Sequence, residues 1–148
     1  MTMNGEKIYE YDLDITSVTD YGVNMEAILG GQEKVPLQGA RFDVTLAGSI
    51  KGRVSGSMRG VDYLRVRADG RREIDLRATI ETNDGNRIAF SADGVATPRD
   101  GEPIVDLSVN IHLSTAAAAY AWVNARQTWG VGYVNLATQK IHIEGYLQ

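Results

Sequence analysis

The stretch that decides the fold reads GVDYLRVRADGRREIDLRATIETNDG and runs from Gly60 to Gly85. Two runs of alternating residues are separated by Ala68-Asp69-Gly70, and the second run ends at Asn83-Asp84-Gly85. Asp-Gly connections are typical of tight hairpin turns, because Gly and Asp tolerate the positive φ that the favoured turns require. We therefore expect the centre of an antiparallel meander, with strands near residues 61–68, 72–82 and 87–94.

Alternation of apolar and polar residues continues through most of the chain and predicts further strands. Gly48, Gly52 and Gly56 recur every four residues, and glycine inside a strand marks a bulge, a bend or a close backbone approach. We interpret residues 40–56 as two strands with a kink and 95–103 as a loop, and allow one helical turn at 114–119. Further strands are expected at residues 7–18, 104–113, 128–136 and 140–147, and shorter strand-like runs lie at 23–29 and 120–127.

The count of nine or ten strands with almost no helix predicts an all-β fold. A closed antiparallel β-barrel is favoured over a sandwich, because closure removes the edges that so many strands would otherwise expose. The length of 148 residues, without a linker-like stretch, fits a single β-barrel domain over 1–148.

Composition restricts the function classes. The formal charge is -4 and there is no extended Lys/Arg cluster, which argues against a nucleic-acid partner. Cysteine is absent and only two histidines occur, which excludes cysteine and three-histidine metal sites and leaves only a mixed His/carboxylate site open. We expect no metal and no cofactor. No apolar run is long enough to cross a bilayer and no signal peptide precedes the first strand, so we expect a cytoplasmic protein without a membrane partner.

Three stretches resemble the DUF3237 family (also called UPF0311), small bacterial proteins of unassigned activity. They are residues 60–85, VPLQGARF (35–42) and YAWVNARQTWGVG (120–132), in the order and spacing of that family. The resemblance implies a lipocalin-like or allene-oxide-cyclase-like barrel that associates with itself, so we expect a homo-oligomer. It carries over to Asp62, Asp75, Trp122 and Asn124, which lie inside these motifs.

The acidic residues of the central meander are candidates for acid/base chemistry. Asp62 shares parity with Leu64 and Val66 and therefore faces the interior, where a carboxylate needs a partner or a function; at the strand start it is otherwise an Asp in a turn. Tyr63 then faces the opposite way. Asp75 has the parity opposite to the aliphatic face, so it is a solvated surface residue in a filled barrel, or a lumen carboxylate in a barrel with a mixed cavity.

Two further groups suit a small-molecule site. His112 lies on the polar face of its expected strand, where it is either merely exposed or a proton carrier near neutral pH. Tyr120, Trp122 and Asn124 share one face of their stretch, which favours an aromatic pocket wall with one amide anchor or, alternatively, ordinary core aromatics.

Three functions remain open on the sequence alone. The first is a cofactor-independent lyase, isomerase, hydratase or cyclase acting on a hydrophobic or aromatic oxygenated metabolite. In it, Asp62 or Asp75 is the acid/base group and His112 or Tyr63 its partner, while Asn124 anchors the substrate beside the wall formed by Trp122. The second is a non-catalytic protein that binds a small hydrophobic ligand in the same cavity. The third is a structural module with a filled barrel.

Overall fold

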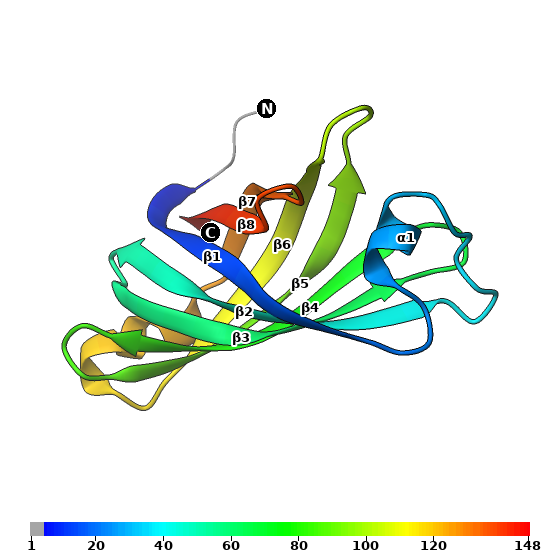
Figure 1. Ribbon diagram of the computed structural model, residues 1–148. Coiled ribbons are helices and arrows are strands. Elements are labelled where there is room, and N and C mark those ends of the chain that lie inside the picture. Colours follow the sequence, from blue (N-terminus) through cyan, green and yellow to red (C-terminus); the bar gives the residue numbers. More distant parts are fainter. Residues whose placement is uncertain (1–4) are drawn as a thin grey trace.

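The chain folds into a closed antiparallel barrel, in which each of eight strands pairs with the next and β8 pairs with β1 (Figure 1). The computed structural model describes residues 5–148. The strands are β1 (Glu6–Asp20), β2 (Ala40–Gly52), β3 (Gly56–Val66), β4 (Arg72–Thr82), β5 (Arg87–Pro98), β6 (Ile104–Ser114), β7 (Thr128–Asn135) and β8 (Lys140–Leu147). The helices are α1 (Met25–Leu29) and the 3-10 helix η1 (Ala118–Ala125). The predicted all-β barrel is confirmed, with eight strands instead of nine or ten.

The central meander forms as its turns predict. β3, β4 and β5 pair in sequence, with Arg65 opposite Glu73 and Glu81 opposite Arg87. Gly70 and Gly85 both have φ of +90°, the left-handed conformation for which glycine carries no side-chain penalty. Both Asp-Gly hairpins are therefore present where the sequence predicts them.

Four local predictions were wrong, and the lower strand count follows from them. Residues 40–56 hold one strand, β2, and only the first residue of β3, although the close backbone approach expected of the glycines is present. A side chain at Gly48 would collide with the Asp12 carbonyl, and one at Gly56 with the Glu81 carbonyl. The expected loop at 95–103 is shorter, because β5 continues to Pro98.

The other two errors are helices that were interpreted as strands. Residues 25–29 form α1, which begins where the Asn24 side chain accepts a 3.0 Å hydrogen bond from the Ala27 amide. Residues 118–125 form η1 instead of a strand. Local hydrogen bonds thus override an apolar alternation that is too short to specify a strand.

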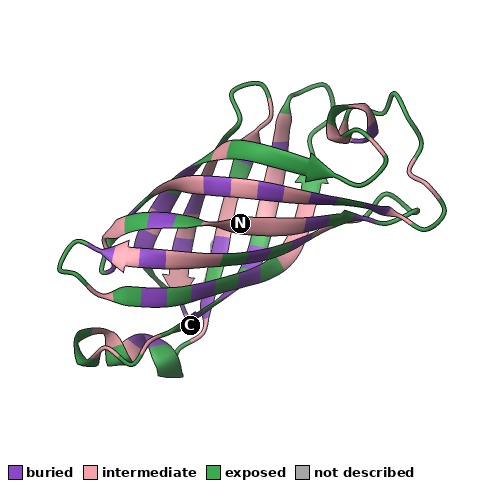
Figure 2. Ribbon diagram, turned by 60° about the horizontal axis from the view of Figure 1, so that its bottom comes forward, coloured by how far each residue is buried: buried purple, intermediate pink, exposed green. Residues whose placement is uncertain are grey.

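Buried and exposed residues alternate along the strands, so each strand has one face toward the barrel interior (Figure 2). The interior near η1 is filled by large side chains. The Tyr11 and Phe90 rings meet edge to face with centroids 5.6 Å apart, and Met58, Ile80 and Ile88 are almost fully buried beside them. This half of the barrel is a packed core.

η1 covers that filled end of the barrel. Its Val123 is buried, the Tyr120 hydroxyl donates to Asp84 Oδ2 at 2.9 Å, and the Arg53 guanidinium lies 4.1 Å from the centre of a Trp122 ring. Arg53 and Asp84 belong to the β2–β3 and β4–β5 connections. Both turns at this end are therefore joined to η1.

α1 lies at the other end of the barrel, in the connection between β1 and β2 (Figure 1). Its Ile28 is buried, whereas Met25 and Leu29 are partly buried against the barrel core. In residues 5–148, neither helix combines the length and apolar character needed for a membrane crossing.

The contact between Arg53 and Trp122 predicts an energetic coupling between these residues. In a double-mutant cycle with Arg53→Ala and Trp122→Ala, we expect a coupling of about 1 kcal/mol in the free energy of unfolding, because a cation over an indole ring contributes about that much at a partly exposed site. Urea denaturation followed by circular dichroism measures it. The control cycle pairs Trp122→Ala with Arg59→Ala, whose guanidinium binds Glu81, and should give no coupling. Equal coupling in both cycles would contradict the assignment.

Candidate functional site

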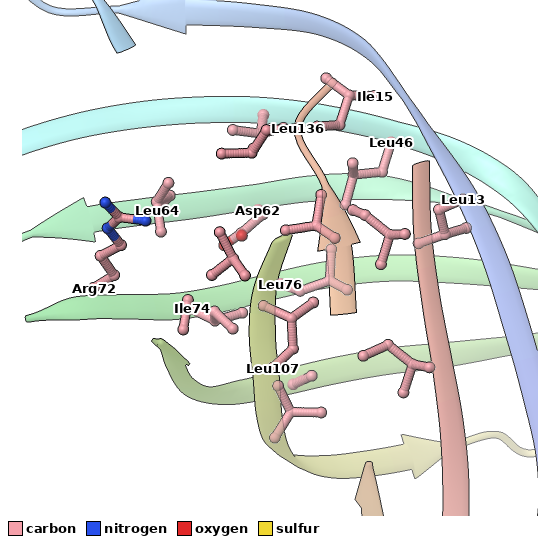
Figure 3. A pocket seen from close by; sticks show the side chains of 18 of the residues that line it. Leu13, Ile15, Leu46, Asp62, Leu64, Arg72, Ile74, Leu76, Leu107 and Leu136 are labelled. Atoms are coloured by element: carbon pink, nitrogen blue, oxygen red, sulfur yellow. The ribbon is translucent and has the colours of Figure 1, made fainter. Parts of the chain in front are cut away.

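A cavity occupies the half of the barrel nearer α1 (Figure 3). The volume of this cavity is about 90 Å3. Among the residues that line it, three carry polar side chains, namely Tyr11, Asp62 and Arg72; the other lining side chains are apolar. A mostly apolar cleft with few polar anchors is the usual form of a small-molecule site.

Asp62 lines this cavity from β3, as the alternation of its strand predicts. The ladder between β3 and β4 pairs Asp62 with Leu76 and Arg65 with Glu73. In the gap between these pairs, the backbone amide of Asp75 donates a 3.0 Å hydrogen bond to Asp62 Oδ1. The carboxyl group is thus held in place by the neighbouring strand.

Burial among aliphatic side chains raises the pKa of Asp62 to about 6. The amide hydrogen bond from Asp75 opposes this shift because it stabilises the carboxylate, and the charge of Asp75 adds to it. Removal from water is the largest of these effects. A carboxyl group with a pKa near 6 can both accept and donate a proton close to neutral pH.

Tyr11 lies between the filled core and the cavity and lines the latter. Complete burial raises its pKa well above the usual value, and the charges of Tyr9 and Asp62 raise it further. Its phenol group is therefore neutral at physiological pH. A neutral phenol can donate a hydrogen bond to a ligand oxygen that gains negative charge.

Arg72 is the first residue of β4 and lies at one side of the cavity lining (Figure 3). Asp62 lies among aliphatic side chains in the same view. Its Nη2 donates a 3.1 Å hydrogen bond to the Leu29 carbonyl and so joins β4 to α1. Partial burial lowers its pKa from the ordinary value. No salt bridge joins this guanidinium to a carboxylate within residues 5–148.

A second, more polar hollow continues the cavity to the outside, between α1 and the β5–β6 turn. It shares Ile15, Met25, Leu29, Arg72, Val105 and Leu136 with the cavity lining. Arg99, Glu26 and Glu102 border this outer hollow but not the cavity. The outer hollow and the cavity therefore meet at α1 and Arg72.

Three of the residues singled out in the sequence have side chains outside the cavity. Asp75 is on the outer face of β4 and about half exposed, 3.8 Å from Arg77 Nε. Tyr63 faces outward from β3, where the Arg41 guanidinium lies 5.5 Å from its ring centre. His112 is exposed on the outer face of β6, opposite Ser91. Of these three residues, Asp75 contacts Asp62, and it does so through its backbone amide and not through its side chain.

Tyr120, Trp122 and Asn124 lie in η1, at the end of the barrel opposite the cavity mouth. Asn124 closes the connection around η1: its Oδ1 accepts from the Thr115 amide at 2.8 Å, and its Nδ2 donates to the Thr115 carbonyl at 2.8 Å. None of the three lines the cavity. In the described part of the chain, these residues contact the filled end of the barrel and help to cover it.

Sequence reasoning missed two polar residues of the cavity, although the same signal identifies them. Arg72 has the parity of Ile74 and Leu76, and Tyr11 has the parity of Leu13 and Ile15. The rule that turns Asp62 inward turns these side chains inward as well. An arginine directly after a turn and a tyrosine among aspartates are, however, equally typical of an exposed surface.

One group of side chains on the outer barrel surface has the composition of a metal site. Potential ligand atoms of Glu10, His142 and Glu144 lie within 4.8 Å of one another. Lys7 binds both glutamates at 2.9 and 2.8 Å, and His142 Nδ1 lies 2.8 Å from Asp12. Ion pairs therefore already use these groups, and the cluster is separate from the cavity.

Comparisons with known proteins agree with this architecture. The family model described as "Protein of unknown function (DUF3237)" matches residues 23–146. A comparison with curated proteins finds no match.

Three solved structures illustrate the shared fold. A β-barrel like protein from Acinetobacter baumannii is 18% identical, with 97% of this chain and 94% of that chain covered and a TM-score of 0.78. A protein of unknown function from Clostridium acetobutylicum is 18% identical, with 97% of each chain covered and a TM-score of 0.79. A protein described as an enzyme from Penicillium herquei is 20% identical, with 98% of this chain and 94% of that chain covered and a TM-score of 0.68.

The raised pKa of Asp62 predicts that Asp62→Asn stabilises the protein at neutral pH. In the unfolded chain an aspartate ionises near pH 4, whereas folded Asp62 ionises near 6, so the folded state binds more protons between these values and its stability falls as the pH rises through this window. Asn removes this cost and still accepts from the Asp75 amide. We expect a gain of about 1–3 kcal/mol in the free energy of unfolding at pH 7.5 that disappears at about pH 4.

Urea denaturation at several pH values measures this difference. The matched control is Asp75→Asn, one strand away on the outer face, which should change stability by less than about 0.5 kcal/mol at either pH. A destabilised Asp62→Asn variant at pH 7.5 would show that the carboxylate is well solvated or paired in the fold.

Proposed function

Because the chain belongs to the DUF3237 family, whose description assigns no reaction, we propose a function from the cavity: cofactor-independent proton transfer on a hydrophobic or aromatic oxygenated metabolite. The reaction class is that of a lyase, isomerase, hydratase or cyclase. Asp62 is the acid/base group. The observation that carries the proposal is one carboxyl group, with a pKa near 6, in an otherwise largely apolar cavity.

The chemistry needs only this carboxyl group and the substrate. The Asp62 carboxylate accepts a proton from a substrate carbon or hydroxyl, and the carboxylic acid that results returns the proton to a different atom of the same molecule. An isomerisation or cyclisation then proceeds without net loss of atoms or electrons. A substrate oxygen that gains negative charge in this step accepts a hydrogen bond from the neutral Tyr11 phenol, which reduces the barrier.

The apolar lining supports the same assignment from the substrate side. Leu64, two residues along β3, and Leu76, the ladder partner of Asp62 on β4, line the cavity beside Asp62 (Figure 3), so a bound hydrophobic molecule excludes water from the carboxylate. A poorly hydrated carboxylate is a stronger base toward carbon than one in water. The side chains of Asp75, Tyr63 and His112 have no part in this mechanism, because they lie on the outer face.

A second candidate is a non-catalytic protein that binds a small hydrophobic ligand. The preponderance of aliphatic residues in the lining favours it, because such a lining suits carriage as well as catalysis. The fold is shared with a protein described as an enzyme, but one fold supports many functions. The placement of Asp62 within the aliphatic wall favours the catalytic candidate, since a pure carrier gains nothing from a partly buried acid.

A generic proton-transfer probe tests Asp62 directly. In 5-nitrobenzisoxazole, a base removes the C3 proton while the N–O bond breaks, and the product is a coloured cyanonitrophenolate. We expect turnover by the wild-type protein, with kcat/KM rising through about pH 6 as Asp62 ionises. Asp62→Asn should lower kcat/KM by about 100-fold or more, because removal of a general base costs roughly that factor.

Asp75→Asn is the comparison variant, because its side chain lies one strand away but outside the cavity. It should keep kcat/KM within about threefold of wild type. Equal rates for wild type and Asp62→Asn would remove Asp62 from the acid/base role. Undiminished binding of the probe without turnover in any variant would favour the carrier.

A further inference from the structure

Arg72 is a cation in the cavity wall without a counter-ion among residues 5–148. Among residues 5–148, its one hydrogen bond goes from Nη2 to the Leu29 carbonyl. A guanidinium has five N–H donors in a planar fork, so most of its donors have no acceptor from the described chain. Partial burial without a counter-ion is unfavourable for such a charge.

The neighbouring charged groups do not neutralise it. Arg99 at the outer hollow is bound by Asp106 at 3.0 and 2.7 Å. Glu26 and Glu102 border the outer hollow together with Arg72, but among residues 5–148 neither carboxylate forms a salt bridge with its guanidinium. Asp62 lies deeper, because its strand partner Leu76 is four residues along β4 from Arg72. Four residues of strand correspond to about 13 Å.

We propose that Arg72 is an anion-recognition group and that the ligand is an apolar or aromatic molecule bearing one acidic group, such as a carboxylate or phenolate. The acidic group binds the Arg72 fork near the mouth, and the apolar body extends along β3 and β4 over Asp62. This inference rests on the proposed function for the identity of the reacting group, but the recognition step does not depend on turnover.

The arrangement explains why the cavity contains both an arginine and an aspartate. Arg72 orients the molecule, because the planar guanidinium forms two parallel hydrogen bonds to a carboxylate and so fixes the plane and direction of that group. Asp62 then faces a defined part of the apolar body. A neutral hydrophobic ligand would leave the Arg72 charge without a counter-ion and so would bind less tightly.

Two ligands of nearly equal shape test this recognition. 2-Naphthoate carries a carboxylate and 2-naphthamide replaces it with a neutral amide; equilibrium binding of each is measured at pH 7.5 by quenching of ligand fluorescence. We expect wild-type protein to bind 2-naphthoate about tenfold or more tightly than 2-naphthamide, because a hydrogen-bonded charge pair contributes about that factor. In Arg72→Met the ratio should fall to about one, with the affinity for 2-naphthamide within about twofold of wild type.

Arg77→Met is the matched control, because Arg77 lies on the outer face of the same strand; it should keep the wild-type ratio. Arg72→Lys retains the charge without the fork and should keep a preference for the anion. A wild-type ratio near one, an unchanged ratio in Arg72→Met, or no binding of either ligand would overturn the proposal. The wild-type ratio decides the matter even if Arg72→Met fails to fold.

The two proposals fail separately. If Arg72 recognises the anion but Asp62 is not a base, the binding ratio stays at ten or more while Asp62→Asn and wild type react equally with 5-nitrobenzisoxazole. If Asp62 is a base but Arg72 does not recognise an anion, the loss of turnover in Asp62→Asn remains while the binding ratio is near one.

Discussion

Closure of the sheet is the constraint on which the site depends. Eight strands enclose an interior that is just wide enough to be filled by side chains or to hold one small ligand. Near η1 the inward positions carry Tyr9, Phe90 and Met58 and fill the space. Nearer α1 they include Ala92 and Ala96, and the space is not filled. One barrel therefore combines a packed core with a cavity, and the size of the inward side chains decides where one ends and the other begins.

The same closure determines the electrostatics of the cavity. Once β3 is part of the barrel, the alternation of side chains along the strand directs Asp62 toward the interior. Its carboxyl group therefore lies in an apolar environment. The Asp75 amide reduces the cost of ionisation without cancelling it. The pKa of Asp62 is higher in the folded than in the unfolded chain, so ionisation of Asp62 lowers the free energy of unfolding by the same amount that the pKa shift represents. A buried carboxyl group with a raised pKa thus lowers the stability of the structure when it ionises.

Much of the fold, but only part of the site, could be predicted from the sequence. The two Asp-Gly turns define β3, β4 and β5, and parity correctly turns Asp62 toward the interior. Parity would also identify Arg72, but a charged residue just after a turn is so often exposed that the pattern does not decide. A pattern of alternation specifies two faces and does not specify which face a cavity or the solvent adjoins.

The residues of η1 illustrate the second limit of sequence patterns. Tyr120, Trp122 and Asn124 alternate as they would in a strand, yet the bonds from the Asn124 amide to Thr115 hold a 3-10 helix. Such side-chain to backbone bonds have no period in the sequence. The aromatic residues that the sequence pattern places in a pocket wall lie instead in η1, which covers the filled end of the barrel.

The two ends of the barrel differ in how firmly they are covered, and Arg72 connects this difference to ligand binding. η1 is joined to both adjacent turns, and the Arg126 guanidinium binds the Gln148 carbonyl at 3.0 Å beside it. α1 has five residues, too few to be stable alone, so its position depends on its packing against the barrel and on the bond from Arg72 to Leu29. Since the guanidinium uses one donor for Leu29 and has others left, a ligand can bind Arg72 without releasing α1. In the proposed binding mode, entry past α1 and recognition of the ligand both involve Arg72, whose side chain binds the helix and lines the cavity.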